Sequence, residues 1–236
     1  MAYLYQQIFY RPILNLLIVL YNTVGLHNLG FAIILATLVI RLILYPFFHK
    51  GARQQMLMQR IQPHIKKIQE KHKEDRDAQG RALMELYKEH GVNPFSGILL
   101  LIIQLPILIT FYLVVRSGVG SGQLVGLYSF VTNPGALNTI FLGFIDLAKP
   151  NFVLIVLAAL SQYLQAKLTI YKAPDSGPLT QTEKIARQMV FVGPLMTLLI
   201  FYNFPAALGL YWIITSVFSA IQQYFVNKHL QQKYGA

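Results

Sequence analysis

The chain contains no cysteine, and only 12% of its 236 residues are charged. The absence of cysteine excludes a disulfide scaffold, a thiolate zinc site, a cysteine nucleophile and a haem-attachment motif. A soluble domain carries roughly 25% charged residues, about twice the fraction found here. Hydrophobic residues make up 55% of the chain, which argues against intrinsic disorder. The composition therefore favours a membrane protein.

Acidic residues are also scarce, because nine Asp and Glu stand against twenty Lys and Arg, a net charge of +11. Such a basic chain is typical of nucleic-acid binding, or of a membrane protein whose positive charge gathers on one side. Five apolar segments favour the membrane, since each approaches the roughly 20 residues that a helix needs to cross a bilayer. They are Leu29–Phe48, Phe95–Val115, Phe152–Tyr171, Met189–Phe204 and Ala206–Val226.

The basic residues are distributed unevenly over the loops of a five-span topology. Ten Lys and Arg lie between Lys50 and Pro94, whereas the loops on the opposite side contain only Arg11, Arg116 and Lys149. Loops rich in Lys and Arg stay on the cytoplasmic side of the membrane. The asymmetry predicts that the N-terminus lies outside and the C-terminus lies in the cytoplasm.

Residues 1–26 are not expected to form a sixth span, because their apolar stretch Ile13–Tyr21 has only nine residues. The segment lacks the basic start and the small-residue cleavage site of a signal peptide. An uncleaved signal-like segment stays open as an alternative. The tyrosines of residues 1–26 predict an amphipathic helix that lies along the outer membrane interface.

Residues 50–94 predict a cytoplasmic hairpin of two helices. One apolar stripe at helical spacing runs over Met56–Ile68 and another over Leu83–Tyr87, with the charged run Lys71–Asp77 between them. Pro63 is expected to interrupt the first helix. The basic surface suits RNA or anionic lipid, but interleaved acids and the lack of an aromatic platform favour a solvated hairpin.

Arg41 lies within the first predicted span, and none of the five spans contains Asp or Glu. An arginine at the centre of a membrane helix costs about 2.5–3.5 kcal/mol on insertion scales. Its side chain tilts toward the helix N-terminus and therefore away from the nearer interface. The sequence predicts either a water-filled polar cavity around Arg41 or hydrogen bonds to backbone carbonyls freed by Pro194.

Uncharged polar side chains at helical spacing favour the cavity. Thr37 precedes Arg41 by one helical turn and shares its face. In the alternative interpretation, these side chains are ordinary hydrogen-bonding contacts between helices. The candidate cavity residues are Arg41, Thr37, Gln104, Gln162, Gln165, Tyr211 and Thr215, with Tyr45, Thr169, Ser219 and Gln222 on the same stripes.

The sequence lacks the common signatures of catalysis. It contains neither GxxxxGK[ST] nor HExxH, and its spans contain no carboxylates for acid–base chemistry. The six histidines are scattered, so no metal site is predicted. We therefore expect a protein that is not an enzyme and has no cofactor.

Three motifs resemble those of the YidC-type membrane protein insertases. They are Arg41 within TLVIRLILYP, Asn93-Pro94 followed by Gln104–Pro106, and FPAALGLYW at Phe204–Trp212. The hairpin after the first span and the closely joined fourth and fifth spans are similar too. The resemblance covers essentially the whole chain.

The resemblance implies an all-α integral membrane protein of the bacterial plasma membrane. Its fold is a five-transmembrane-helix core with an external interfacial N-terminal helix and a cytoplasmic helical hairpin. Its groove, open to the cytoplasm and to lipid, receives clients. In the family's pattern Arg41 is the groove arginine and Thr37 the hydroxyl one turn before it. Tyr211 and Trp212 match the aromatic pair that contacts nascent helices.

The implied partners are nascent membrane proteins and the lipid bilayer, with the Sec translocon, the signal recognition particle pathway and the ribosome as further candidates, and no DNA. Many relatives of that family carry an additional N-terminal span and a large periplasmic domain, and neither is expected in this chain. It also lacks a lipoprotein cysteine. Only ten residues follow Val226, so ribosome docking through a long basic tail is not expected.

Our hypothesis from the sequence is an insertase that uses no nucleotide, in which Arg41 attracts the acidic or polar N-terminal tail of a client. Two alternatives are a small anion channel or transporter with Arg41 as the selectivity charge, and a structural scaffold. The predicted segments are an external helix (1–26), spans at 27–49, 95–116 and 151–171, the hairpin (50–94), an external loop (117–150), a cytoplasmic loop (172–187), the joined fourth and fifth spans (188–226) and a cytoplasmic tail (227–236).

Overall fold

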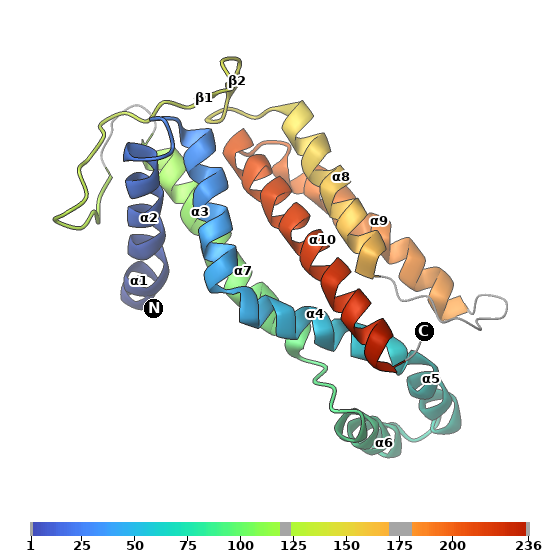
Figure 1. Cartoon of the computed structure of the whole chain (residues 1–236). Helices are drawn as coiled ribbons and strands as arrows, with labels where there is room; N and C mark the ends of the chain where they lie inside the picture. Colours follow the sequence, from blue (N-terminus) through green and yellow to red (C-terminus); the bar gives the residue numbers. More distant parts are fainter. Residues whose placement is uncertain (1, 119–123, 170–180, 235–236) are drawn as a thin grey trace.

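The computed structural model describes residues 2–118, 124–169 and 181–234, and it is predominantly helical (Figure 1). Long helices form a bundle, with an irregular loop that contains two short strands at one end and a helical hairpin at the other. The elements are α1 (Ala2–Tyr5), the π-helical η1 (Gln6–Tyr10), α2 (Arg11–Asn22), α3 (Leu29–Ile43), α4 (Tyr45–Arg60), α5 (Gln62–Lys71), α6 (Arg76–Glu89), α7 (Ser96–Gly118), β1 (Ile140–Phe141), β2 (Ile145–Asp146), α8 (Phe152–Thr169), α9 (Gln181–Phe201) and α10 (Ala206–Tyr234).

The first predicted span is bent rather than continuous. α3 ends at Ile43, and α4 leaves it at an angle of 70°. Pro46 lies in the first turn of α4, where its missing N–H leaves no hydrogen bond unmade and its fixed φ favours a new helix. The predicted apolar segment Leu29–Phe48 therefore comprises two helices that meet at a bend, and its role as one span stays a prediction.

The helices of the N-terminal segment pack on the bundle. α1, η1 and α2 follow one another without a break from Ala2 to Asn22, and they contact α3 and α7. Leu14, Leu17 and Ile18 are fully buried, whereas Tyr3 is 72% exposed. One face of this segment thus belongs to the protein core, and its position at the outer interface stays a prediction.

The main hydrophobic core lies where α2, α3 and α7 meet the loop that carries β1 and β2. The start of α10 joins it through Ala207, Leu208 and Tyr211. This end of the bundle is therefore closed by packed apolar side chains. Its largest fully buried members are Leu14, Leu17, Ile18, Leu29, Ile33, Phe111, Val114, Val115, Leu147 and Leu208.

The predicted external loop contains structure that the all-α expectation missed. β1 and β2 form a two-stranded antiparallel hairpin, in which Ile140 pairs with Asp146. Asn15 of α2 fastens the same loop, because its Nδ2 donates to Gly126 O (3.1 Å) and its Oδ1 accepts from Tyr128 N (2.7 Å). The glycine-rich residues 119–123 lie outside the described part.

α5 and α6 form the predicted helical hairpin. Ile61, Ile65, Leu86 and Val92 pack together between them. Asp75 caps α6 by accepting from two backbone N–H groups. Met56 was predicted to belong to the apolar stripe of the hairpin. It lies instead on α4, which is part of the bundle.

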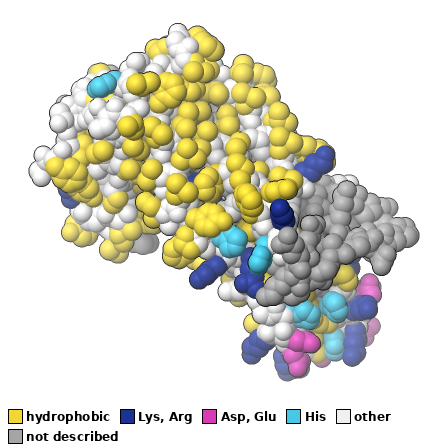
Figure 2. All heavy atoms as spheres, viewed as in Figure 1, with side chains coloured by type: hydrophobic (Ala, Val, Ile, Leu, Met, Phe, Trp, Pro, Cys, Tyr) yellow, Lys and Arg dark blue, Asp and Glu magenta, His cyan; other side chains and the backbone are white. Residues whose placement is uncertain are grey.

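Charged side chains and histidines gather around this hairpin in the visible face, whereas hydrophobic side chains cover much of the bundle (Figure 2). The exposed hydrophobic residues include Leu42, Phe152, Leu164, Phe191 and Leu199, which lie on several different helices. A bundle with so much exposed apolar surface is suited to a lipid environment.

By length and composition, two of the described helices can cross a membrane, Phe152–Thr169 and Ala206–His229. The bent pair α3–α4 adds a third if it is counted as one span. Ile102–Gly118 and Val190–Phe201 are shorter apolar stretches, so the count of five spans stays a prediction.

The fourth and fifth predicted spans form a tight hairpin, since α9 ends at Phe201 and α10 begins at Ala206. α10 continues to Tyr234, so most of the predicted tail 227–236 is helical. The end of the predicted third span and most of the predicted loop 172–187 fall on residues 170–180, outside the described part.

Candidate functional site

A polar cavity of about 540 Å³ lies between α3, α4, α7, α8 and α10, on the hairpin side of the main core. Eight glutamines contribute to its wall. Its lining residues include Arg41, Gln54, Gln55, Gln59, Asn93, Ser96, Gln104, Gln162, Gln165, Thr169, Trp212, Thr215, Ser216, Ser219, Gln222 and Gln223.

Arg41 lies in the last turn of α3 and is 5% exposed. Because the chain bends by 70° after Ile43, the first turns of α4 bring Phe48 against the guanidinium. The Arg41 Cζ atom lies 4.0 Å from the centroid of the Phe48 ring. This is within the range of a cation–π contact.

Arg41 has no acid beside it. No Asp or Glu is among the cavity residues, and Arg41 Nη1 has no hydrogen-bond partner among the described residues. Nη1 therefore makes no hydrogen bond to a backbone carbonyl freed by Pro194 within the described residues. A buried, unpaired charge is costly unless water or a ligand solvates it. The cavity thus has a single fixed positive charge with free hydrogen-bonding capacity.

The inner end of the cavity is built around Tyr211. Gln104 of α7 donates to the Tyr211 hydroxyl, and the Tyr211 ring packs on Phe111 with the ring centroids 4.9 Å apart. Tyr211 is 2% exposed and belongs to the main core. It therefore lies behind Gln104 rather than on the cavity surface.

The wall formed by α8 and α10 contains the other predicted residues. Gln162 accepts a hydrogen bond from the Thr197 hydroxyl of α9, which orients its amide. Trp212 packs edge-on against Phe201, and its buried Nε1 has no partner within the described residues. Trp212 therefore offers a free donor beside the polar wall.

The structure brings six of the eight predicted site residues to one cavity: Arg41, Gln104, Gln162, Gln165, Trp212 and Thr215. The other two do not line it. Tyr211 supports it from behind, and Thr37 is 1% exposed and donates to Ile33 O of its own helix at 2.6 Å.

Several lining residues were not predicted. Gln55 and Gln59 lie one turn apart on α4, and Gln54 lies beside them. The spacing of four residues could have indicated a polar face. The prediction assigned these residues to the cytoplasmic hairpin because it did not include the bend at Leu44.

At the end near the hairpin, α10 packs across α4. Met56 and Val226 are each 2% exposed and form one buried cluster, with Ala52 packed against it. Gln222 Nε2 donates to Tyr45 O at 3.3 Å, and Asn227 Nδ2 donates to Leu168 O at 2.8 Å. α10 is thus fastened to both α4 and α8 at this end.

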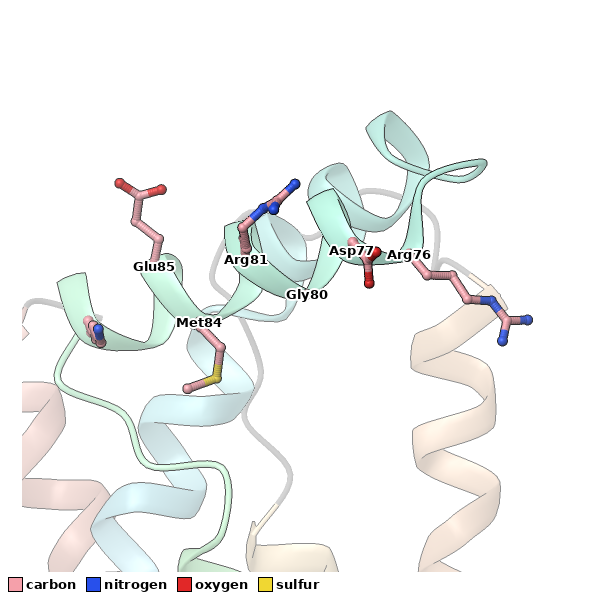
Figure 3. A pocket seen from close by; sticks show the side chains of 7 residues that line it. Arg76, Asp77, Gly80, Arg81, Met84 and Glu85 are labelled. Carbon is pink, nitrogen blue, oxygen red and sulfur yellow. The ribbon is translucent and has the colours of Figure 1, made fainter.

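A second hollow, on the hairpin, is shallow and is formed by α6 alone. Figure 3 shows that the side chains of Arg81 and Glu85 point away from the helix into the surroundings, as does that of Arg76. Its residues alternate in charge, so it is a solvated helix face. No group of three His, Cys, Asp or Glu residues suited to a metal ion occurs in the described part.

These features define a class of helical membrane protein with a polar cavity and one buried arginine. The chain belongs to the 60Kd inner membrane protein family, whose sequence profile matches residues 19–233. The YidC-type resemblance found in the sequence is thereby confirmed.

The similar curated proteins are named membrane protein insertase YidC. That of Wolinella succinogenes is 36% identical over 225 residues, covering 95% of this chain and 38% of the relative. That of Francisella tularensis subsp. novicida is 38% identical over 204 residues, covering 86% of this chain and 33% of the relative. These names describe insertases and not enzymes or channels, and this chain spans about a third of the relatives' length.

A solved structure agrees with this assignment. The crystal structure of an active YidC insertase with the first transmembrane domain resolved is similar, with a TM-score of 0.64 and 28% sequence identity. The similarity covers 94% of this chain and 46% of that one. The similarity therefore includes the fold of nearly the whole chain.

Proposed function

We propose that this chain inserts membrane proteins, and that its polar cavity receives the N-terminal tail of a client. The observation that carries the proposal is Arg41, a buried cation without an acid beside it in a cavity lined by uncharged polar groups. Its family membership and the names of its relatives support the same function. The clients are nascent membrane proteins, and the setting is a lipid bilayer.

In this mechanism an acidic or polar tail enters the cavity and interacts with Arg41. The glutamine amides replace part of the tail's hydration, which lowers its desolvation cost. The client's apolar helix then moves sideways into lipid, driven by burial at roughly 25 cal/mol per Å². A membrane potential assists outward movement of an acidic tail by about 2.3 kcal/mol per charge per 100 mV.

The proposed topology has five spans, with the N-terminus outside and the C-terminus in the cytoplasm. The main core then lies near the outer face and the cavity lies toward the cytoplasm. The hairpin α5–α6 meets clients or targeting factors. The Sec translocon, the signal recognition particle pathway and the ribosome stay proposed partners.

Reconstitution into liposomes tests the role of Arg41. Arg41→Ala is expected to lower insertion of an acidic-tailed single-span client about 10- to 100-fold, the scale of one lost charged hydrogen bond. Arg41→Lys should keep most activity, since the proposal needs the charge rather than the guanidinium geometry. Arg53→Ala, at an exposed arginine of α4, is the matched control and should insert normally.

Changing the client separates electrostatics from damage to the fold. Neutralising the acidic residues of the client's tail should reduce the difference between the parent chain and Arg41→Ala. The proposed electrostatic step is wrong if Arg41→Ala inserts the acidic client as well as the parent does. Photocrosslinking to a stalled client from Gln104 and Gln162, with exposed Met84 as the control site, tests whether the tail enters this cavity.

A further inference from the structure

Two histidines face one another at the base of the hairpin. His64 lies in the first turn of α5, and His90 directly follows α6. Their ring centroids are 5.7 Å apart, with an angle of 43° between the ring planes. Both side chains are exposed, so an ion from solution can reach them. Only the folding of the hairpin brings these residues together.

The separation of the rings fits a shared metal ion. A histidine nitrogen binds Zn²⁺ at about 2.0–2.1 Å, which places the ring centroid about 3.2 Å from the ion. Two such rings with centroids 5.7 Å apart subtend an angle of about 125° at the ion. This angle is within reach of tetrahedral coordination, so the separation of the rings allows one ion to be shared when a nitrogen of each ring turns toward it.

The tautomer of His90 also suits a metal ligand. His90 Nδ1 lies 3.1 Å from Leu86 O, and a carbonyl oxygen can only accept, so this hydrogen bond assigns the proton to Nδ1. In the neutral tautomer that carries this proton, Nε2 is the nitrogen with a lone pair for a metal ion. Metal-binding histidines commonly donate their other ring N–H to a backbone carbonyl in this way, which fixes the orientation of the ring.

We propose that His64 and His90 form a two-histidine site for a divalent transition-metal ion. Imidazole nitrogens suit Zn²⁺, Ni²⁺ and Cu²⁺, whereas Mg²⁺ and Ca²⁺ prefer oxygen ligands. Within the described residues no third His, Cys, Asp or Glu completes the set. Water molecules fill the remaining positions, and Cu²⁺ binds more tightly than Zn²⁺.

A bound ion would fasten α5 to α6 beside the mouth of the polar cavity. Gln54 lines that cavity, and its side chain donates to Gly91 O (3.3 Å) and accepts from Asn93 N (3.0 Å). Gly91 follows His90 directly. The ion therefore restrains the segment that joins the hairpin to the cavity wall, and its binding does not depend on insertase activity.

Zinc titration of the full chain in detergent tests the site, with purification through a tag that contains no histidine. The parent is expected to bind one Zn²⁺ in competition with a chromophoric chelator. His64→Gln and His90→Gln should each weaken binding about tenfold or more, and the double variant should bind no better than either. His72→Gln, at the opposite end of the same hairpin, is the matched control and should bind like the parent.

A second measurement identifies the ligands directly. Electron paramagnetic resonance of the parent with one equivalent of Cu²⁺ should show coupling to two imidazole nitrogens, and to one in either single variant. Zn²⁺ should also slow amide hydrogen exchange over residues 88–93 in the parent but not in His90→Gln. Equal zinc affinity of the parent and both single variants, with equal thermal unfolding, would overturn the site and leave only a ring contact.

Discussion

The guanidinium of Arg41 lies over the ring of Phe48, and these two residues come from helices that meet at a 70° bend. The bend therefore also determines the surroundings of Arg41. It supplies the buried arginine with an aromatic face on one side while its Nη1 stays unpartnered within the described residues. A cation held in this way is positioned without being neutralised, which is the property that the proposed function needs.

Replacing the aromatic ring is expected to destabilise the protein. Phe48→Leu keeps an apolar side chain but removes the π face, and the cost should be about 0.5–2 kcal/mol of unfolding free energy. A double-mutant cycle with Arg41→Gln, measured by thermal unfolding in detergent, isolates the interaction between the two side chains. A coupling energy near zero would contradict the cation–π assignment. Phe47→Leu is the matched control, because Phe47 is 54% exposed.

Gly30 is required by the close approach of Phe141 to α3. A Cβ atom at position 30 would overlap the Phe141 ring, which joins the loop that carries β1 and β2 to the core. Gly30→Ala should therefore cost about 1–3 kcal/mol of stability, the usual cost of overpacking. Thermal unfolding measures the loss.

In the double variant Gly30→Ala/Phe141→Leu, the smaller leucine side chain leaves room for the added Cβ atom, so part of the lost stability should return. Gly80→Ala is the control, since its added Cβ meets nothing within 4 Å and α6 should gain about 0.5–1 kcal/mol. If Phe141→Leu lowers stability further in the Gly30→Ala background, the steric explanation is wrong.

Asp146 makes the loop that carries β1 and β2 sensitive to acid. Burial alone would raise the pKa of its carboxyl, but hydrogen bonds from the Thr139 hydroxyl and the Ala148 N–H, together with the Lys149 ammonium, lower the pKa below its usual value of 3.8. A lowered pKa in the folded protein stabilises it above pH 3.8, and the contribution disappears as the pH falls through the lowered pKa.

Asp146→Asn should accordingly lower the thermal unfolding temperature at pH 7. The difference in unfolding temperature between this variant and the parent should shrink as the pH falls below 3.8 and through the lowered pKa of Asp146. Lys149→Ala should have a smaller effect, because the lysine side chain is 78% exposed and surface ion pairs contribute little. A difference between Asp146→Asn and the parent that stays constant from pH 7 to pH 3 would exclude the charged carboxylate as its cause.

The sequence predicted much of the helical framework because that information is local. Hydrophobic length located the apolar helices, and Pro205 located the tight turn between α9 and α10. The burial of Arg41 agrees with its place in an apolar segment without acids. These properties depend on near neighbours in the chain.

The missed features depend on residues that are distant in sequence. Gln54 and Gln59 reach the cavity because α4 leaves α3 at an angle of 70°, and Pro46 was the available signal for that bend. Met56 fits the apolar stripe of the hairpin by spacing, yet it packs on Val226. The pairing of His64 with His90 likewise needs the hairpin to fold first.

The contact between Met56 and Val226 predicts a way to close the cavity reversibly. The chain has no cysteine, so Met56→Cys/Val226→Cys places a single pair of thiols where α4 and α10 pack together. Oxidation should link the helices and lower insertion of reconstituted clients severalfold, because a tail that enters from the hairpin side has to separate them. Reduction should restore the activity, and each single-cysteine variant should be insensitive to oxidant. Full insertion by a completely crosslinked protein would mean that clients do not enter between α4 and α10.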